Sequence, residues 1–161
     1  MSEDLIKKTA QAIRRSKKVV ALTGAGISVE SGIPDFRGPS GLWEKFDPME
    51  YATIEAFVAN PKKVWAMLKE MGSLVEKAEP NPAHLALARL EKMGYLSSIV
   101  TQNIDNLHQA AGSKRVIEFH GNSSKLLCMS CGRLYGRKEM VLDTLPPRCS
   151  CTGILKPDVV F

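Results

Sequence analysis

Apolar residues near the start of the chain recur at the spacing of one helix face. Ser2 offers an N-cap and an acidic first turn follows, so residues 3–16 are predicted to form a helix. A β-branched run over 19–22 then leads through Thr23 into a glycine-rich loop, which is typical of a buried parallel strand.

Two Asn-Pro pairs place a cap residue directly before proline, the preferred order at a helix start. After Asn60-Pro61, an apolar stripe at helical spacing is typical of core packing rather than of a cofactor site; its members are Val64, Trp65, Leu68, Met71, Leu74 and Val75. Asn81-Pro82 opens a second helix, which runs to Met93 and ends at Gly94.

Short strands are predicted over 98–101 and 116–119, so strands alternate with helices along the chain. That alternation predicts an α/β fold with right-handed crossovers and a Rossmann-like parallel sheet covered on both faces. Residues 32–48 are rich in glycine and proline and are predicted to form a long loop. Long loops in compact domains are usually functional.

The bulk composition sets limits on the class of protein. A chain of 161 residues with 44% hydrophobic and 24% charged residues suits one globular domain with a small inserted module. No apolar run approaches the roughly 18 residues of a membrane span, and the polar first residues do not resemble a signal peptide. We therefore expect a cytoplasmic protein with no membrane partner.

The chain is basic, with a formal net charge of +5 and a pI near 9.1, which raises the question of an acidic partner. The lysines and arginines between Lys7 and Lys18, however, lie along one amphipathic stretch, where a solvated helix face is the simpler interpretation. We expect no direct nucleic-acid partner.

A candidate dinucleotide site begins at Gly24-Ala25-Gly26-Ile27-Ser28, directly after the first strand. Glycines there allow close backbone approach to a pyrophosphate, although Val29 stands at the usual third glycine and a tight turn has the same composition. Ligands of parallel sheets bind beyond the carboxyl ends of the strands, where the sequence also places Gln102-Asn103-Ile104-Asp105 and His120.

These polar residues suit the chemistry of such a ligand. Asn103 and Asp105 offer an amide and a carboxylate to a ring carboxamide, and His120 can exchange protons near neutral pH. Simpler roles exist for each: His120 as a turn residue, and Asp105 as the cap of a helix that starts at Asn106. We assign His84 and His108 structural roles, His84 in the first turn of a helix and His108 facing a helical neighbour.

All four cysteines lie in the last quarter of the chain. Cys128-x-x-Cys131-Gly132 is a metal-binding turn, and Cys149-x-Cys151 follows after 17 intervening residues. Four sulfur ligands leave no open coordination position, so the pattern predicts one structural zinc ion that does not touch substrate. Redox-active or incidental thiols are the alternatives.

Five motifs in this order resemble the sirtuins, a family of NAD-dependent protein lysine deacylases. They are Gly24 to Ser28, Gly32-Ile33-Pro34-Asp35-Phe36-Arg37, Thr101 to Asp105, His120-Gly121 and the four cysteines. The resemblance implies an NAD-binding Rossmann-like large domain over 1–121 with a helical insert near 38–78. It also implies a small zinc-ribbon domain over 122–157 and a return to the large domain over 158–161.

By this resemblance, NAD is a co-substrate and the partner is an acylated lysine of a protein or peptide. The residues implied in cofactor binding are Gly24, Ala25, Gly26, Ser28, Ile33, Asp35, Phe36, Arg37, Gln102, Asn103, Ile104, Asp105 and His120. His120 is implied as the general base, with Asn103 beside it as a second catalytic residue. The family's acyl-lysine oxygen attacks the ribose carbon that carries nicotinamide, giving free lysine, nicotinamide and O-acyl-ADP-ribose.

Acyl preference follows from the helix after Pro61. Sirtuins that favour succinyl groups carry a Tyr and an Arg three residues apart on this helix, where this sequence has Leu68 and Met71. Neither side chain can pair with a carboxylate, so we expect an apolar pocket for acetyl or longer neutral acyl groups. By analogy, Val160 also lies near the substrate.

Sirtuins continue well beyond the segment from Lys156 to Phe161, so the resemblance implies an incomplete sheet, a truncated chain and doubtful activity for these residues alone. Two alternatives remain open. Mono-ADP-ribosyl transfer would use the same site with another acceptor. A non-enzymatic zinc ribbon that binds nucleic acid is suggested by four basic residues around the cysteines: Arg133, Arg137, Lys138 and Arg148.

Overall fold

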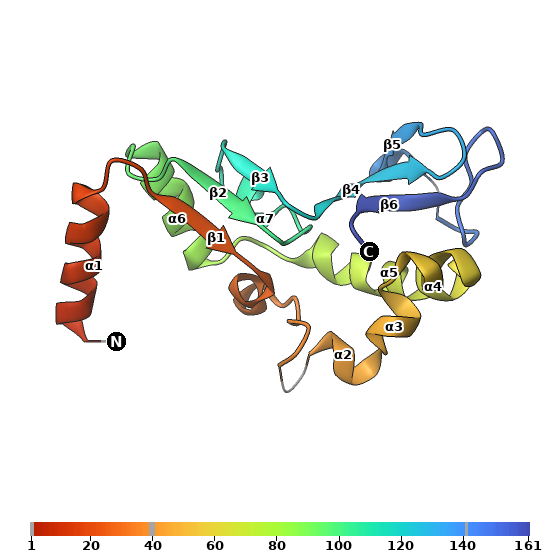
Figure 1. Ribbon diagram of the computed structural model, residues 1–161, viewed down its shortest axis with the longest axis horizontal. Coiled ribbons are helices and arrows are strands. Elements are labelled where there is room, and N and C mark those ends of the chain that lie inside the picture. Colours follow the sequence, from red (N-terminus) through yellow and green to blue (C-terminus); the bar gives the residue numbers. More distant parts are fainter. Residues whose placement is uncertain (1, 39–40, 141) are drawn as a thin grey trace.

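The computed structural model describes residues 2–38, 41–140 and 142–161. Residues 39–40 of the predicted loop and Val141 of the predicted zinc domain lie outside the described residues. Figure 1 shows an elongated molecule in which a parallel sheet lies toward one end and an antiparallel sheet toward the other, with helices running beneath both.

The first sheet carries the predicted strands. Its strands are β1 (Val20–Thr23), β2 (Ser98–Thr101) and β3 (Val116–Glu118), in the order β1-β2-β3, and both pairings are parallel. Thr23 pairs with Thr101, and Thr101 pairs with Glu118, so the three carboxyl ends are level. This alignment confirms the predicted α/β fold and brings the three following loops to one edge.

One face of this sheet is covered by helices. Ile99 and Thr101 are buried on that face, and Figure 1 shows α6 (Pro82–Lys92) and the short α7 (Leu107–Ala110) beside the sheet. On the opposite face the side chain of Leu22 is 73% exposed and that of Ile117 is 55% exposed. Because paired residues in register share a face, the prediction that both faces are covered is wrong for the described part of the chain.

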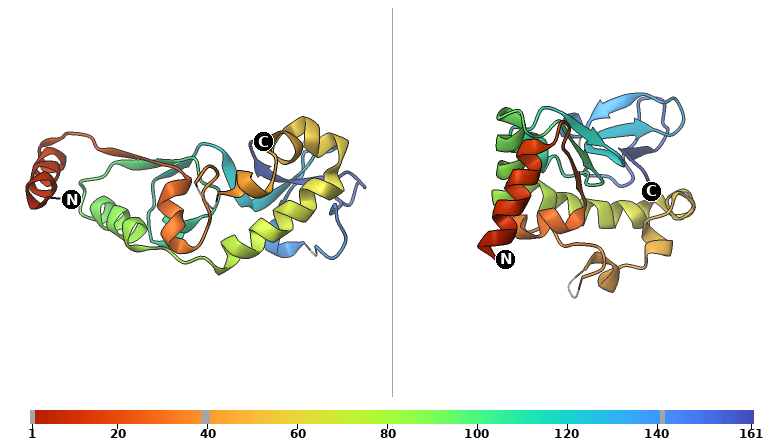
Figure 2. Two further views of the ribbon diagram at one scale, coloured as in Figure 1. Left: turned by 90° about the horizontal axis from the view of Figure 1, so that it is seen from below. Right: turned by 60° about the vertical axis from the view of Figure 1, so that its left-hand side comes forward.

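Helix α1 (Glu3–Arg15) matches the predicted first helix to within one residue. Ser2 caps it and its first turn is acidic, but it has no buried residue among those described. Figure 1 and the left-hand view of Figure 2 show it standing away from the rest of the molecule. Its apolar stripe at Leu5 and Ile6 is therefore exposed.

A helical segment follows the glycine-rich loop and packs against the second sheet. It consists of α2 (Leu42–Lys45), α3 (Pro48–Tyr51), α4 (Ile54–Ala59) and α5 (Pro61–Lys77). Side chains of Asp47, Thr53 and Asn60 accept hydrogen bonds from the first turns of α3, α4 and α5. Helix α2 lies inside the segment that the glycine and proline content predicted to be a loop.

The second sheet is antiparallel and carries the cysteines at its far end. Strands β4 (Gly121–Cys128), β5 (Leu134–Gly136) and β6 (Leu155–Val159) are ordered β5-β4-β6, and the short helix η2 (Arg137–Glu139) follows β5. Strand β6 extends to Val159, which pairs with Gly121, so residues 158–159 continue this sheet.

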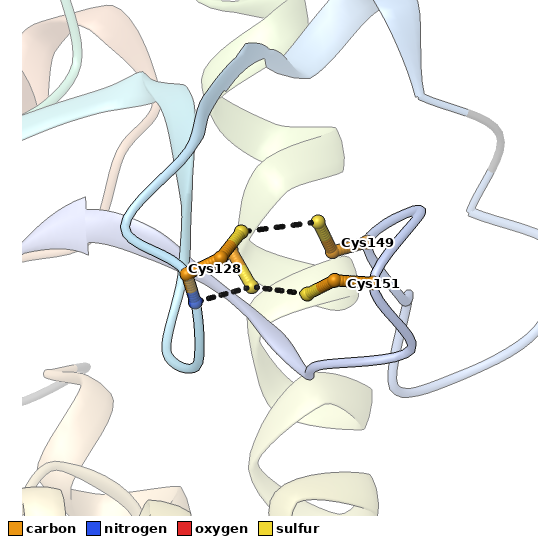
Figure 3. Close-up of side chains that lie close together, drawn as sticks. Cys128, Cys149 and Cys151 are labelled. Atoms are coloured by element: carbon orange, nitrogen blue, oxygen red, sulfur yellow. Dashed lines mark hydrogen bonds between the residues drawn. The ribbon is translucent and has the colours of Figure 1, made fainter.

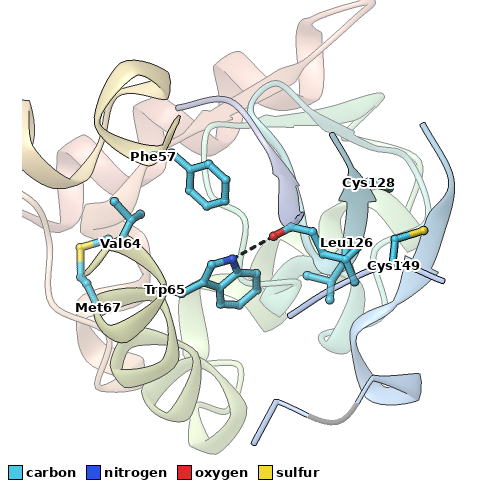
Figure 4. Packing of buried hydrophobic residues seen from close by; sticks show 8 residues of the cluster. Phe57, Val64, Trp65, Met67, Leu126, Cys128 and Cys149 are labelled. Atoms are coloured by element: carbon cyan, nitrogen blue, oxygen red, sulfur yellow. Dashed lines mark hydrogen bonds between the residues drawn. The ribbon is translucent and has the colours of Figure 1, made fainter. Parts of the chain in front are cut away.

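The main apolar cluster joins α4 and α5 to the second sheet (Figure 4). Its buried members are Phe57, Val64, Trp65, Met67, Leu126, Cys128, Cys149 and Leu155. Trp65 is fully buried, and its indole N–H donates to the backbone oxygen of Leu155 at 2.8 Å. Because the buried indole is also hydrogen-bonded, it fixes the position of α5 against β6 in addition to burying apolar surface. Helix α5 is thus attached to the sheet that carries the cysteines.

Candidate active site

The glycine turn after β1 leads into a short 3-10 helix, η1 (Ala25–Ser31), rather than an α-helix. Within it, Ser28 is buried and faces the loop that follows β2. Its hydroxyl donates to Oδ2 of Asp105 at 2.7 Å and accepts from the side-chain amide of Asn103 at 3.0 Å. Two loops separated by about half the chain are therefore joined by one hydroxyl.

Asp105 has two roles at once. Its Oδ1 accepts from the backbone N–H of Leu107 at 2.9 Å, as the simpler capping interpretation predicted, while Oδ2 holds Ser28. Asn103 is oriented from its other side, because its backbone N–H donates to the hydroxyl of Thr101 at 3.1 Å. The loop after β2 is consequently pre-organised by its own polar side chains.

His120 lies between the two sheets, two residues after the end of β3 and directly before β4. Its Nδ1 is 3.1 Å from the backbone oxygen of Gln102. A carbonyl oxygen can only accept, so Nδ1 carries the proton of the neutral ring and Nε2 keeps a free lone pair. A half-buried imidazole in that tautomer can act as a proton acceptor.

Gly121 is required directly after this histidine. Its φ is +81°, and an added Cβ would lie 3.0 Å from Cα of Val159 and would collide with the backbone oxygen of Asp158. Only glycine tolerates both the left-handed backbone and the close approach of β6. The motif His120-Gly121 thus has a structural as well as a chemical reason.

The predicted residues gather around one cavity of about 900 Å³. Nine predicted cofactor residues line it: Ala25, Ile33, Phe36, Arg37, Gln102, Asn103, Ile104, Asp105 and His120. The three predicted substrate residues, Leu68, Met71 and Val160, line the same cavity. Of the remaining predicted residues, Ser28 holds Asp105 from behind, Asp35 accepts from the N–H of Gly38 at 2.8 Å, and Gly24 and Gly26 belong to the turn.

Several lining residues were missed by the sequence analysis. Trp43 stacks on Phe36 with ring centroids 5.1 Å apart, and Tyr51 and Met67 also line the cavity. Arg137 lines it from η2, the short helix that follows β5. The aromatic residues of the glycine-rich segment were a usable signal, whereas no local pattern distinguishes Arg137 from its basic neighbours.

His84 and His108 form a buried pair, consistent with the structural roles assigned to them. Their ring centroids are 4.9 Å apart, and Nε2 of His108 is 2.9 Å from the hydroxyl of Thr23. Burial lowers the pKa of both rings, and for His108 the neighbouring His84 adds to the lowering. Both rings therefore remain neutral at the pH at which an ordinary histidine begins to gain a proton.

The four cysteines form one cluster. Their sulfur atoms all lie within 4.8 Å of one another, and Figure 3 shows Cys149 and Cys151 facing Cys128 from the opposite loop. The Cys128–Cys151 and Cys131–Cys149 sulfur pairs are each 3.6 Å apart. A tetrahedral zinc with sulfur at about 2.3 Å separates its ligands by about 3.8 Å, so the cluster fits a structural zinc ion.

The surroundings of Cys149 favour its thiolate. The backbone N–H of Cys151 and the Tyr135 hydroxyl, 3.0 Å from the sulfur, lower the pKa of Cys149 to about 5. Metal ligands must be deprotonated, so this environment suits cation binding. The cavity lining does not include any of the four cysteines, as expected for a metal that plays a structural role.

Together, these features define an α/β protein with a ligand cleft at the carboxyl edge of a parallel sheet and a four-cysteine metal module. A model of the Sir2 family matches residues 24–161, and the chain belongs to that family.

Named relatives agree with this assignment. The chain is 51% identical over 159 residues to an NAD-dependent protein deacetylase of Sulfolobus acidocaldarius, covering 96% of this chain and 63% of the relative. It is 50% identical over 164 residues to an NAD-dependent protein deacylase of Archaeoglobus fulgidus, covering 99% and 64%.

Solved structures show the same fold. One described as the structural basis for the mechanism and regulation of Sir2 enzymes superposes with a TM-score of 0.89 at 50% identity, covering 99% of this chain and 65% of that one. A Sir2 complex with a p53 peptide and NAD superposes with a TM-score of 0.86 at 38% identity, covering 97% and 64%. The chain thus spans a little under two thirds of the length of these proteins.

No helix among the described residues is long and apolar enough to cross a membrane.

Proposed function

We propose that this chain carries the catalytic groups of an NAD-dependent protein lysine deacylase. The observation that supports this most directly is the orientation of His120, whose Nδ1–H is held by Gln102 while the ring lines the same cavity as the loop after β2. Relatives named as NAD-dependent deacetylases and deacylases, and the Sir2 complex with peptide and NAD, support the same reaction.

In this proposal, NAD supplies a ribose carbon that becomes electrophilic as nicotinamide departs. Asn103 and Asp105 hold the nicotinamide side of the cleft, and the link from Ser28 to Asp105 keeps that side rigid. Ala25, Phe36 and Arg37 hold the remainder of the cofactor, and Phe36 is itself supported by its stack on Trp43. His120 Nε2 accepts a proton from a ribose hydroxyl.

The acyl-lysine partner is proposed to enter between the two sheets. Leu68 and Met71 on α5 and Val160 after β6 line the cavity there, so the acyl group meets apolar side chains. The boundary between the NAD-binding domain and the zinc domain falls in this proposal near residues 121–122, where β3 gives way to β4. The thiol cluster suits a reducing compartment such as the cytoplasm.

The experiment is a nicotinamide-release assay. The protein, expressed from its natural reading frame, is incubated with NAD and an acetyl-lysine peptide. Release should require the acetyl group and should fall by at least about 100-fold in His120→Ala, since general bases contribute about 10²–10⁴-fold. Release that proceeds equally without an acylated peptide would contradict the proposal.

The same assay separates the two alternatives. Mass spectrometry that finds ADP-ribose attached to a protein, with the peptide still acetylated, would favour mono-ADP-ribosyl transfer. A nucleic-acid role is less well supported, because Arg133 donates to Ser150, Arg148 donates to the Thr152 backbone and Arg137 lines the cavity. Salt-dependent DNA binding without any effect of NAD would nevertheless revive it.

A further inference from the structure

Arg137 reaches the cavity from the second sheet by passing over α5. It is the first residue of η2, and its guanidinium lies against Gly72 of α5. A Cβ added to Gly72 would collide with Nη2 of Arg137 and would lie 3.0 Å from Cζ. Glycine at this position therefore leaves the space through which the arginine approaches.

The guanidinium is largely buried yet poorly paired. The Arg137 side chain is only 14% exposed, and its Nε lies 3.8 Å from Oε1 of Glu76, whose side chain is 67% exposed. Between the described residues, the Arg137 side chain donates no hydrogen bond to the protein. A guanidinium has five N–H donors, and burying this charge with only one distant ion-pair partner is costly. These donors face a cavity, where a ligand can reach them.

The position of the guanidinium identifies the part of the ligand it would meet. Leu68, Met71 and Gly72 follow one another along α5, and all three line the cavity together with Arg137. An acyl chain that packs on Leu68 and Met71 and continues in the same direction reaches Gly72, where the arginine lies. Glu139 also lines this end, but its carboxylate accepts from the Gly136 N–H at 3.3 Å.

We propose that Arg137 is a specificity-determining residue that binds the terminal carboxylate of a dicarboxylic acyl group on the substrate lysine. Arginine suits this role because its planar fork matches a carboxylate with two parallel hydrogen bonds. The expectation of neutral acyl groups followed from the side chains of α5 alone, whereas the guanidinium of Arg137 comes from η2 on the opposite side of the pocket. Acetyl groups have no carboxylate and gain nothing from it. The inference rests on the proposed deacylase function.

The test compares three lysine peptides of one sequence: acetyl, pentanoyl and glutaryl. The last two both have five-carbon chains, and they differ in the terminal carboxylate. The wild-type protein should turn over the glutaryl peptide with a higher kcat/KM than the pentanoyl peptide. Arg137→Met should lower the glutaryl kcat/KM by about 10- to 100-fold, the range for a charge-assisted hydrogen bond, and change the acetyl value less than about twofold.

Two further variants separate recognition from a structural role. Glu76→Gln removes the protein's own partner of Arg137, so it should keep the glutaryl preference, whereas loss of a merely structural ion pair would make it resemble Arg137→Met. Gly72→Ala displaces the guanidinium and should reduce the glutaryl preference, with thermal denaturation used to check that the variant is folded.

Equal losses with all three peptides in Arg137→Met, or no preference of the wild type for glutaryl over pentanoyl, would overturn the role of Arg137. Failure of every peptide to release nicotinamide would instead refute the deacylase function. Calorimetric binding of the glutaryl and pentanoyl peptides would then decide the role of Arg137 independently, because tighter glutaryl binding that is lost in Arg137→Met requires no turnover.

Discussion

Replacing Ser28 by alanine should loosen the link between the first two loops of the cleft. The hydroxyl donates to the Asp105 carboxylate at 2.7 Å and accepts from Asn103 at 3.0 Å, and Ser28 is almost fully buried. A hydrogen bond to a charged group contributes about 1.5–3 kcal/mol and a neutral one about 0.5–1.5 kcal/mol. We therefore expect Ser28→Ala to reduce the free energy of unfolding by about 2–4 kcal/mol.

Urea unfolding followed by circular dichroism measures this loss, and calorimetry measures the accompanying change in NAD affinity. Ser31→Ala is the matched control, because Ser31 lies in the same helix and accepts a single 3.0 Å hydrogen bond from Asn81. It should cost only about 0.5–1.5 kcal/mol. Equal effects of the two substitutions on unfolding and on NAD binding would refute the view that Ser28 organises the site.

Two further predictions concern the buried histidines and the cysteine cluster. Burial lowers the pKa of His84 and His108, so the unfolded chain takes up protons that the folded chain does not as pH falls below the unfolded value of about 6.5. The free energy of unfolding should be insensitive to these groups above pH 7. Below pH 6.5 it should fall by up to about 1.4 kcal/mol per pH unit for each ring. A pH series of urea unfolding measures this fall, and a His108→Gln variant that retains the full wild-type slope would contradict the prediction. Purified protein should contain one zinc ion per chain by elemental analysis, and Cys131→Ser should lose it. Chelation of the metal should also shift the fluorescence of Trp65, since Cys128 and Cys149 belong to the same apolar cluster. The Trp43→Phe variant leaves Trp65 as the tryptophan that is observed, and an unchanged spectrum in this variant would show that the cluster is independent of metal.

Much of the fold could be predicted because local signals and topology agree. The strands leading to Thr23, Thr101 and Glu118 are short apolar runs followed by polar residues, and parallel pairing then forces their ends to one edge. The spacing of the cysteines likewise has few physical interpretations. These features depend on neighbours in sequence or on general rules of sheet topology.

The remainder depends on contacts between distant residues. Nothing near Ser28 in the sequence indicates that its hydroxyl meets Asp105, and nothing near Arg137 indicates that it crosses Gly72. Helices α2 and α3 have only four residues each, so periodicity cannot reveal them among glycines and prolines. The exposed face at Leu22 was missed because an apolar strand alone does not show what covers it.

In the proposed reaction, the place of His120 in the chain links its proton transfer to the arrangement of the two sheets. The residue follows β3 and precedes β4, its ring is held by Gln102, and its backbone oxygen accepts from the Val160 N–H at 2.9 Å. It therefore sits on the seam between the parallel and antiparallel sheets. A rotation of one sheet against the other would turn the imidazole as well, so in the proposed reaction the orientation of the base is coupled to the angle between the two sheets.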